Sequence, residues 1–366
     1  MNMDIVGNKQ KQTAGDNSNQ NQIIGDHTNQ TIIGNINVTE NNTYIDKTPK
    51  LDIVTLTTKV ATQVTKQALA LCTEVASSIA SKRIKDFEDN WVPRLCGMLE
   101  LEKNLREPKF QFMLRDANLT AAKSNRNEDL NLLSELLACH IEKGDNYIID
   151  AAIKRAINIV DEIDNKALCG LTVYSYLKCI CPHSVNIHDG LNDLNQFFSK
   201  LLYLDLPNDY EWLDHLNILG VVRLYSWEHD SLMYTLPKLF DGYICAGIKE
   251  GSKQHKQAID ILDKLGYKNY LVKNELLEGY LKIPLVSLSA CEEQIKPVLE
   301  LYENNDESLI LCASAKFMEI WNSFDILKKI SIWHDNLPVD FSINAVGKVL
   351  AQTNAKRIAT DVPELI

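Results

Sequence analysis

The stretch that decides the fold runs from Asn125 to Asp145 and reads NRNEDLNLLSELLACHIEKGD. Leucine or isoleucine recurs at positions 130, 133, 136, 137 and 141, and this spacing places the apolar side chains on one face of an α-helix. The polar residues before position 130 resemble a helix N-terminus, and Gly144 with Asp145 ends the pattern. We therefore predict a strongly amphipathic helix across this stretch.

The same apolar periodicity continues on both sides of this helix. The longest run extends from 51 to 87 without Gly or Pro, and it predicts a single long helix. Further helices are predicted at 91–105, 110–123, 148–163, 166–179, 188–202, 209–219, 232–248, 257–265, 289–302, 307–333 and 344–358. Because the connections are short and polar, we expect a mainly α fold, with the helices arranged as a bundle or stack.

The C-terminal part, residues 281–366, differs from the helical body at 51–280. A strand is predicted at 281–288, and an extended piece at 340–343 directly precedes the last helix. Within that helix Gly347 is expected to let a neighbouring element approach closely, while Val346, Val349 and Leu350 face inward. Helix, extended piece and helix together look like the end of a winged-helix unit, so we treat 281–366 as a C-terminal subdomain.

Residues 1–43 carry one phrase four times: two small or apolar residues, then Gly, then Asp or Asn. The four glycines fall 8, 10 and 9 residues apart. Gly reaches positive φ without steric cost and Asp or Asn is favoured in turns, so each copy predicts a short strand that ends in a tight turn. The two most apolar copies consist of Ile23, Ile24, Gly25 and Asp26, and of Ile32, Ile33, Gly34 and Asn35.

Such strands carry too little apolar surface to be stable alone. We therefore predict that residues 1–43 pair between subunits as a β oligomerisation element, joined to the body by a linker at 44–50. A β-coil formed within one chain is one alternative. A disordered tail is another, because residues 1–43 include fifteen Asn and Gln and no aromatic residue. The expected partner is a second copy of the chain, and a further protein partner stays open.

The composition of the chain restricts its partners and its compartment. The 366 residues include 38 Lys and Arg against 49 Asp and Glu, a formal net charge of -11. Proteins that bind nucleic acid usually present a basic face, so nucleic acid is not an expected partner. Since there is no signal-peptide pattern and no run of about 18 apolar residues, the sequence predicts a cytoplasmic protein without a stable membrane span. Its nine cysteines are then expected to be reduced thiols.

The order of these patterns resembles that of a known group of proteins. The resemblance rests on Gly15 to Ser18 in the tail, the leucine pattern at 129–137, and the C-terminal segments Ile343 to Gly347 and Asn354 to Arg357. The chain is similar to an uncharacterised bacterial family that has a polar repeat tail before a helical body. Its C-terminal pattern also resembles the abortive-infection alpha proteins of phage defence. This resemblance implies a bacterial cytosolic setting and a defence role, and it transfers no catalytic residues.

One cluster of soft metal ligands stands out, formed by Cys179, Cys181, His183 and His188. Two thiolates and two imidazoles would suit a tetrahedral zinc site. However, the spacing differs from the common zinc motifs, and Cys179 stands where a helix is expected to end. We therefore expect a buried helix end here, with no metal and no cofactor, and keep zinc as the alternative.

Two further clusters place a carboxylate and a histidine near a tryptophan: Glu211 with His215, and Glu228 with His229. Glu211 and His215 are four residues apart and would share one face of a helix. Such groups can serve hydrolysis or bind a metal ion, whereas in an acidic protein they commonly form a solvated face. No phosphate-binding loop, nucleophile elbow or zinc-protease motif is present in the sequence.

The sequence thus predicts a non-enzymatic, homo-oligomeric scaffold or sensor with a role in phage defence. One alternative is a hydrolase or nuclease effector that uses the carboxylate and histidine clusters. Another is a membrane-active effector that uses the predicted helix at 60–80, although Gln63, Lys66 and Gln67 interrupt its apolar character.

Overall fold

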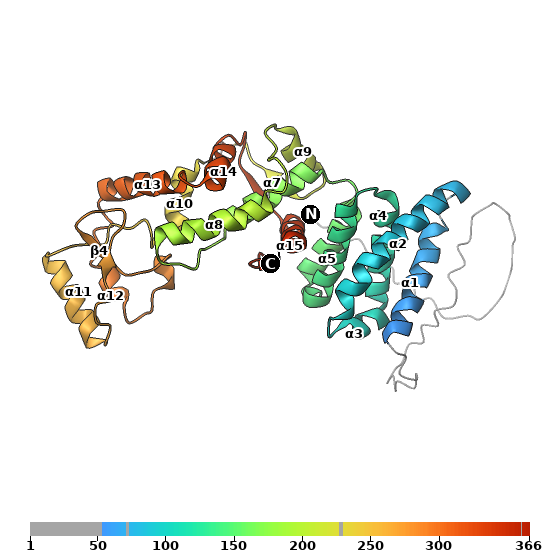
Figure 1. The fold of residues 1–366 in the computed structure, drawn as a ribbon, viewed down its shortest axis with the longest axis horizontal. Helices are drawn as coiled ribbons and strands as arrows, with labels where there is room; N and C mark the ends of the chain where they lie inside the picture. Colours follow the sequence, from blue (N-terminus) through green and yellow to red (C-terminus); the bar gives the residue numbers. More distant parts are fainter. Residues whose placement is uncertain (1–52, 71–72, 227–229, 360) are drawn as a thin grey trace, which may run out of the picture. The chain divides into compact units, whose positions relative to one another are not determined.

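The computed structural model describes residues 53–70, 73–226, 230–359 and 361–366. Across these residues the chain forms fifteen α-helices and five short strands, so the predicted mainly helical fold is confirmed (Figure 1). The predicted repeat tail at 1–43 and linker at 44–50 lie outside the described residues, as do Glu228 and His229.

Helix α5 (Asn127–Lys143) is the helix predicted from the decisive stretch. It packs against α2, α6 and α15, and its predicted leucines are buried. Ala138 and Cys139 are buried as well, so the exposed face of α5 is narrower than an amphipathic helix would have. The neighbouring helices are α1 (Ile53–Leu69), α2 (Glu74–Cys96), α3 (Leu101–Arg106), α4 (Pro108–Lys123), α6 (Tyr147–Ile159) and α15 (Ala345–Ile358).

Arg126 connects the start of α5 to the end of α6. Its guanidinium group donates to the carbonyl oxygens of Val160 and Ile163, each at 2.9 Å, and to the carboxylate of Asp129. Those carbonyls lie at and just beyond the C-terminus of α6, where a helix leaves acceptors unpaired. Burial raises the pKa of Asp129, against the bonds from Ser124 and Arg126 that favour its ionised form. The polar residues that mark the helix start in the sequence therefore stabilise the contact between the start of α5 and the end of α6.

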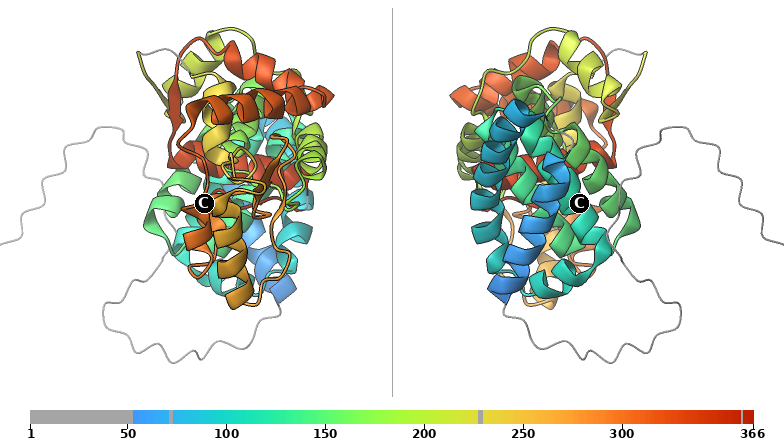
Figure 2. Two further views of the ribbon diagram at one scale, coloured as in Figure 1. Left: turned by 90° about the vertical axis from the view of Figure 1, so that its left-hand side faces the viewer. Right: turned by 90° about the vertical axis from the view of Figure 1, so that its right-hand side faces the viewer.

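The single helix predicted from 51 to 87 is wrong, because the chain forms α1 and α2 instead. Thr73 is the N-cap of α2, with an extended backbone (φ −69°, ψ 164°), and its carbonyl oxygen accepts the Ser77 N–H at 2.7 Å. Glu74 follows in the first turn, where a negative charge is favourable. In the sequence, the Ala-rich apolar periodicity continues through Thr73 and Glu74, so the periodicity does not indicate that a new helix begins there. The segment 60–80 is therefore not one helix, and α1 and α2 lie side by side (Figure 2).

Two other helices are also shorter than predicted. The segment 307–333 forms α13 (Glu307–Trp321) and α14 (Asp325–Asp335), and the indole of Trp321 donates to the carbonyl of Leu327 across the break at 3.0 Å. Helix α10 (Leu232–Leu239) ends before Gly242, where the backbone of Leu285 leaves no room for a Cβ atom.

The remaining helices support the central and C-terminal parts of the chain. Helix α7 is buried from Ala167 to Leu177, on every face, as expected for a helix enclosed by its neighbours. The segment predicted as a helix at 289–302 contains a 3₁₀ turn at 288–290 and only one short helix. These remaining helices are α7 (Asn165–Leu177), α8 (Ile187–Leu201), α9 (Glu211–Ile218), α11 (Lys253–Lys264) and α12 (Lys296–Leu299).

The strands form two small antiparallel sheets. Strand β5 (Phe341–Ile343) matches the predicted extended piece and pairs with β1 (Val222–Leu224), which was not predicted. The second sheet has the order β2 (Ile248–Lys249), β4 (Tyr280–Lys282), β3 (Val272–Lys273). Only the start of the predicted strand at 281–288 is therefore extended and paired.

Gly347 provides the predicted close approach between the last helix and another element. A Cβ atom at this position would lie 2.6 Å from the carbonyl oxygen of Val221 and 2.6 Å from Cγ2 of Ile343. Both distances are far below the contact distance of non-bonded atoms. The absence of a side chain thus allows α15 to dock against β1 and β5.

Buried apolar side chains form two clusters. The larger one extends from Val60 in α1 to Ala355 in α15, and the smaller one lies between Cys245 and Tyr302. The predicted division between 280 and 281 stays a prediction, and α15 packs on α5, α6 and α7 from the body. None of the described helices has the length and apolar character that crossing a bilayer requires.

Candidate functional site

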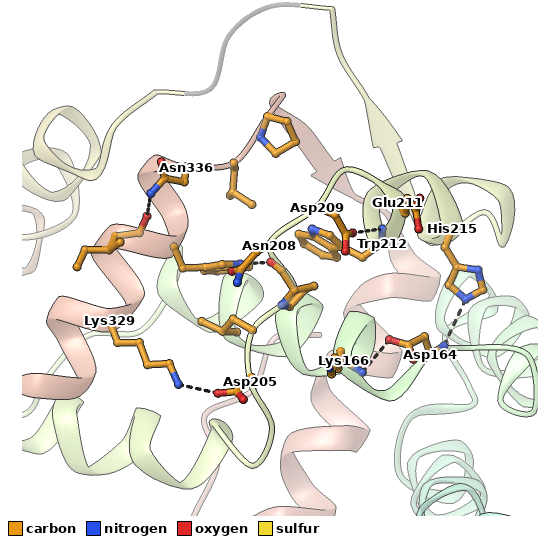
Figure 3. A pocket seen from close by; sticks show the side chains of 16 residues that line it. Asp164, Lys166, Asp205, Asn208, Asp209, Glu211, Trp212, His215, Lys329 and Asn336 are labelled. Carbon is orange, nitrogen blue, oxygen red and sulfur yellow. Dashed lines mark hydrogen bonds and ion pairs between the residues drawn. The ribbon is translucent and has the colours of Figure 1, made fainter.

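A pocket of about 1150 Å³ lies between the start of α7, the connection at 205–209, α9 and α14 (Figure 3). Its walls come from segments that are far apart in the sequence and that the packing of α7, α9, α14 and β5 brings together. Figure 3 shows the labelled charged side chains of the lining distributed around the ring of Trp212.

One part of the lining is polar and predominantly acidic. Its carboxylates are Asp164, Asp205, Asp209 and Glu211, and its ammonium groups are Lys166 and Lys329. Lys329 is paired with Asp205 at 3.1 Å, and both side chains are largely exposed, so this ion pair contributes little to stability. The remaining carboxylates give the pocket an excess of negative charge.

Apolar groups form the rest of the lining. Trp212 and Trp333 lie with their ring centroids 6.0 Å apart, and Phe341 of β5 meets Trp212 edge to face at 5.8 Å. The indole N–H of Trp333 donates to the carbonyl of Pro207 at 2.8 Å, which fixes α14 to the connection at 205–209. The other apolar residues of the lining are Leu206, Ile332, Leu337 and Pro338.

Several acidic groups of the pocket also hold the helices that surround it. Asp164 is the N-cap of α7, and its carboxylate accepts the N–H groups of Lys166 and Ala167, each at 2.9 Å. Asp209 accepts the N–H of Trp212 at 3.3 Å, at the start of α9. Because these carboxylates satisfy helix N-termini, their positions are fixed before any ligand arrives.

His215 connects α9 to the start of α7. Its Nε2 atom accepts the backbone N–H of Asp164 at 3.3 Å. A nitrogen that accepts a hydrogen bond carries no proton, so this bond requires the tautomer whose proton is on Nδ1. The imidazole therefore positions two helices, and its hydrogen bond among the described residues is to a backbone N–H and not to a nucleophilic side chain.

The structure brings together one of the two predicted carboxylate and histidine clusters. Glu211 and His215 both line the pocket, on the same helix, as their spacing predicts. The imidazole of His215 accepts a hydrogen bond from the backbone of Asp164, a partner other than Glu211. The second cluster, Glu228 and His229, lies outside the described residues.

The cysteine and histidine cluster lies at the end of α7 and the start of α8. The thiol of Cys179 donates to the carbonyl of Ser175 at 3.1 Å, as expected for a helix end. Cys179, Cys181 and His183 are all exposed, so the expectation that this helix end is buried is wrong. The ring of His188 packs against Phe324, with centroids 5.1 Å apart. Among the described residues, no three or more His, Cys, Asp or Glu side chains are grouped to hold a metal ion.

A second group of titratable residues lies between α4, α5 and α6, away from the pocket. The carboxylate of Asp150 contacts Lys109 at 3.1 Å, Lys154 at 3.0 Å and Nδ1 of His140 at 3.1 Å. Burial lowers the pKa of His140, so its ring is neutral near pH 7. Burial also favours a raised pKa for Asp150, but the bonds from Lys154 and Lys109 outweigh it and lower that pKa. The two lysines therefore carry the ion pairing, and His140 is a neutral neighbour.

A buried polar network joins the C-terminal helix to the edge of the pocket. The amide of Asn354 donates to Thr172 at 2.8 Å and to Tyr203 at 3.3 Å, and its oxygen accepts from Arg357 at 2.6 Å. Tyr203 in turn donates to the carbonyl of Asn165, next to the N-cap of α7. The segment that carried the family resemblance thus positions one wall of the pocket.

Sequence reasoning identified Glu211 and His215 but missed most of the pocket. Asp164 gave no signal, because it is an ordinary N-cap residue until the fold brings His215 of α9 to its backbone. Lys329 gave none either, because it is an ordinary charged residue of α14 until it pairs with Asp205. Trp333 carries a usable signal, because a tryptophan near a helix end, followed by Leu337 and Pro338, predicts a turn that combines apolar surface with a hydrogen-bond donor.

Comparison with known proteins gives one match. A protein-family model matches residues 54–365, and the description of that family reads ":-like". This description names no activity, and the matched range leaves out residues 1–53. No curated protein and no solved structure matches the chain significantly.

Proposed function

Given that the chain belongs to the ":-like" family over residues 54–365, we propose that it is a non-enzymatic, homo-oligomeric sensor and scaffold in the bacterial cytoplasm, acting in defence against phage. Residues 1–43 assemble the copies, and the helical body recognises a trigger. The defence setting rests on the resemblance of the C-terminal segments to abortive-infection alpha proteins.

The observation that carries this proposal is the way in which the polar groups of the pocket are used. Asp164 and Asp209 satisfy helix N-termini, and His215 accepts a backbone N–H. Groups engaged in this way are preorganised for binding, whereas general acid–base catalysis needs a group within reach of the proton it transfers. The pocket is therefore better suited to recognition than to chemistry.

A challenge of bacteria with phage tests the proposed function. Cells that produce the full chain, or a chain that starts at Thr48, are infected with a panel of phages, and plating efficiency and cell survival are measured. We expect protection by the full chain and its loss in the shortened one. If the shortened chain protects equally well at the same protein level, assembly through residues 1–43 is not needed and the proposal fails.

A hydrolase or nuclease effector is the second candidate, and it is favoured by the presence of Glu211 and His215 in one pocket. The double variant Glu211→Gln/His215→Gln removes an acidic group and a base but keeps an oxygen that can accept the Asp164 N–H. A matched control for the carboxylate is Glu278→Gln, at an exposed position away from the pocket. Loss of nuclease activity or toxicity in the first variant alone, with an unchanged melting temperature, would establish an enzyme.

A further inference from the structure

We propose that the pocket binds an extended peptide segment of a partner protein, one that carries both basic and apolar side chains. This inference rests on the proposed sensing function and names the chemical class of the trigger. The occupant is identified by three properties of the pocket: its charge, its apolar wall and an unpaired hydrogen-bond donor.

The charge of the lining selects a basic ligand. The pocket presents four carboxylates and two ammonium groups, one of which is already paired with Asp205. Asp164 and Asp209 each use one oxygen for a helix N-terminus, and Glu211 is exposed. Lysine or arginine side chains would complement this excess of negative charge, and complementary charge increases the rate and specificity of association.

The size and the apolar wall of the pocket favour a peptide over a small cation. Pockets for small molecules usually measure about 300–1,000 Å³, and this pocket is larger, at about 1150 Å³. Ile332 lies on its wall with 56% of its surface exposed, beside Leu337 and Pro338. Ile332 therefore offers the apolar side chains of a peptide an exposed group to pack against, at the mouth of an otherwise buried tryptophan and leucine wall.

Trp212 supplies the third property. It is 5% exposed, and its ring extends from α9 toward the middle of the pocket lining (Figure 3). Its Nε1–H group has no hydrogen-bond partner among the described residues, although tryptophan N–H groups usually find one when buried. The Nε1 atom is itself buried, so the ring has to turn before a carbonyl oxygen of a bound peptide backbone accepts this bond. A polyamine has no carbonyl to offer.

Binding of a defined probe to the full chain tests the inference. The probe is a fluorescein-labelled decapeptide of alternating leucine and lysine, followed by fluorescence anisotropy at physiological salt. We expect saturable binding that is at least tenfold tighter than that of a glycine–lysine decapeptide, which lacks apolar side chains. Binding should also be at least tenfold tighter than that of a leucine–glutamate decapeptide, which has the opposite charge.

Matched variants separate the pocket from the general acidity of the chain. Asp209→Asn/Glu211→Gln removes two charges from the lining and keeps the oxygen that accepts the Trp212 N–H. Asp260→Asn/Asp263→Asn removes two charges from exposed positions on α11. We expect the first variant to weaken binding at least tenfold and the second to change it less than twofold, with both melting within two degrees of the parent chain.

Three results would overturn the inference. Equal effects of the two variants would mean that the peptide binds by net charge alone. Binding of the leucine–glutamate peptide as tight as that of the leucine–lysine peptide would show that the pocket does not select basic side chains. Displacement of the labelled peptide by an equal concentration of spermine would identify a free polyamine as the occupant. If any of these occurs while the full chain still protects cells against phage, the peptide proposal fails and the proposed function stands.

Discussion

Replacing Gly347 by alanine should destabilise the protein, because α15 docks where no Cβ fits. The new Cβ would lie 2.6 Å from the carbonyl oxygen of Val221, 2.6 Å from Cγ2 of Ile343 and 3.1 Å from Cγ1 of Val221. The carbonyl oxygen accepts the Asn344 N–H, so it cannot retreat without moving the β1 and β5 pair. Overpacking of this kind costs about 1–3 kcal/mol, whereas alanine gains at most about 1 kcal/mol over glycine inside a helix. Two contacts at 2.6 Å place the overpacking cost in the upper part of that range, about 2–3 kcal/mol, so we expect a net loss of roughly 1–2 kcal/mol.

Gly97 provides the matched control for this substitution. It caps α2 with φ −86° and ψ −5°, a conformation open to any residue, and no atom of the described residues lies within 4 Å of the position that a Cβ would take. Alanine here should be neutral or stabilise the protein by about 0.4–1 kcal/mol, because it lowers the conformational entropy of the unfolded chain. Urea unfolding followed by far-ultraviolet circular dichroism measures both variants, with unchanged m values. If Gly347→Ala is as stable as the parent chain or more stable, the described docking of α15 is incorrect.

Three further predictions follow from buried polar groups. Asn118 is 1% exposed, and neither of its amide atoms has a hydrogen bond within the described structure. The variant Asn118→Leu should therefore raise the free energy of unfolding in urea by about 1–3 kcal/mol. A lower free energy of unfolding would show that the amide has a hydrogen-bond partner. Because burial lowers the pKa of His140 below its ordinary value of 6.5, the unfolded chain takes up this proton first, and stability should fall as the pH drops below about 6.5. The variant His140→Gln should flatten that dependence, and an unchanged slope would assign it to another group. Asn354→Ala leaves Arg357 without its amide acceptor and should cost about 2–3 kcal/mol, whereas an unchanged melting temperature would show that the network is dispensable.

The parts of the fold that depend on local sequence could be predicted. The helix at α5 follows from the spacing of its leucines, and the extended piece before α15 follows from its position between two helical patterns. Gly347 was assigned a close contact because a glycine within an apolar helical pattern usually has a packing reason. Each of these inferences uses residues within one or two turns of each other.

Helix breaks were harder to predict than helices. Thr73 starts α2 and Phe324 precedes α14, but apolar periodicity continues through both points. A break inside a periodic run is decided by which face each half buries, and this depends on neighbours elsewhere in the chain. Thr73 with Glu74 was the one local signal, because a threonine followed by an acidic residue is typical of a helix start.

The candidate site depends on contacts between distant segments. Glu211 and His215 could be paired from the sequence because four residues separate them on one helix. The bond from the Asp164 backbone to His215, and the contact of Trp212 with Trp333, join parts of the chain whose relative positions no periodicity specifies. For the same reason β1 was missed, since three residues pair with a strand that lies far along the chain.

The native mass of the full chain tests the central claim, that residues 1–43 assemble copies of this protein. It is measured by light scattering at micromolar concentration, next to the chain that starts at Thr48. The account predicts a multiple of the monomer mass for the full chain and a folded monomer for the shortened one. Monomers in both samples, or the same oligomer in both, would contradict it.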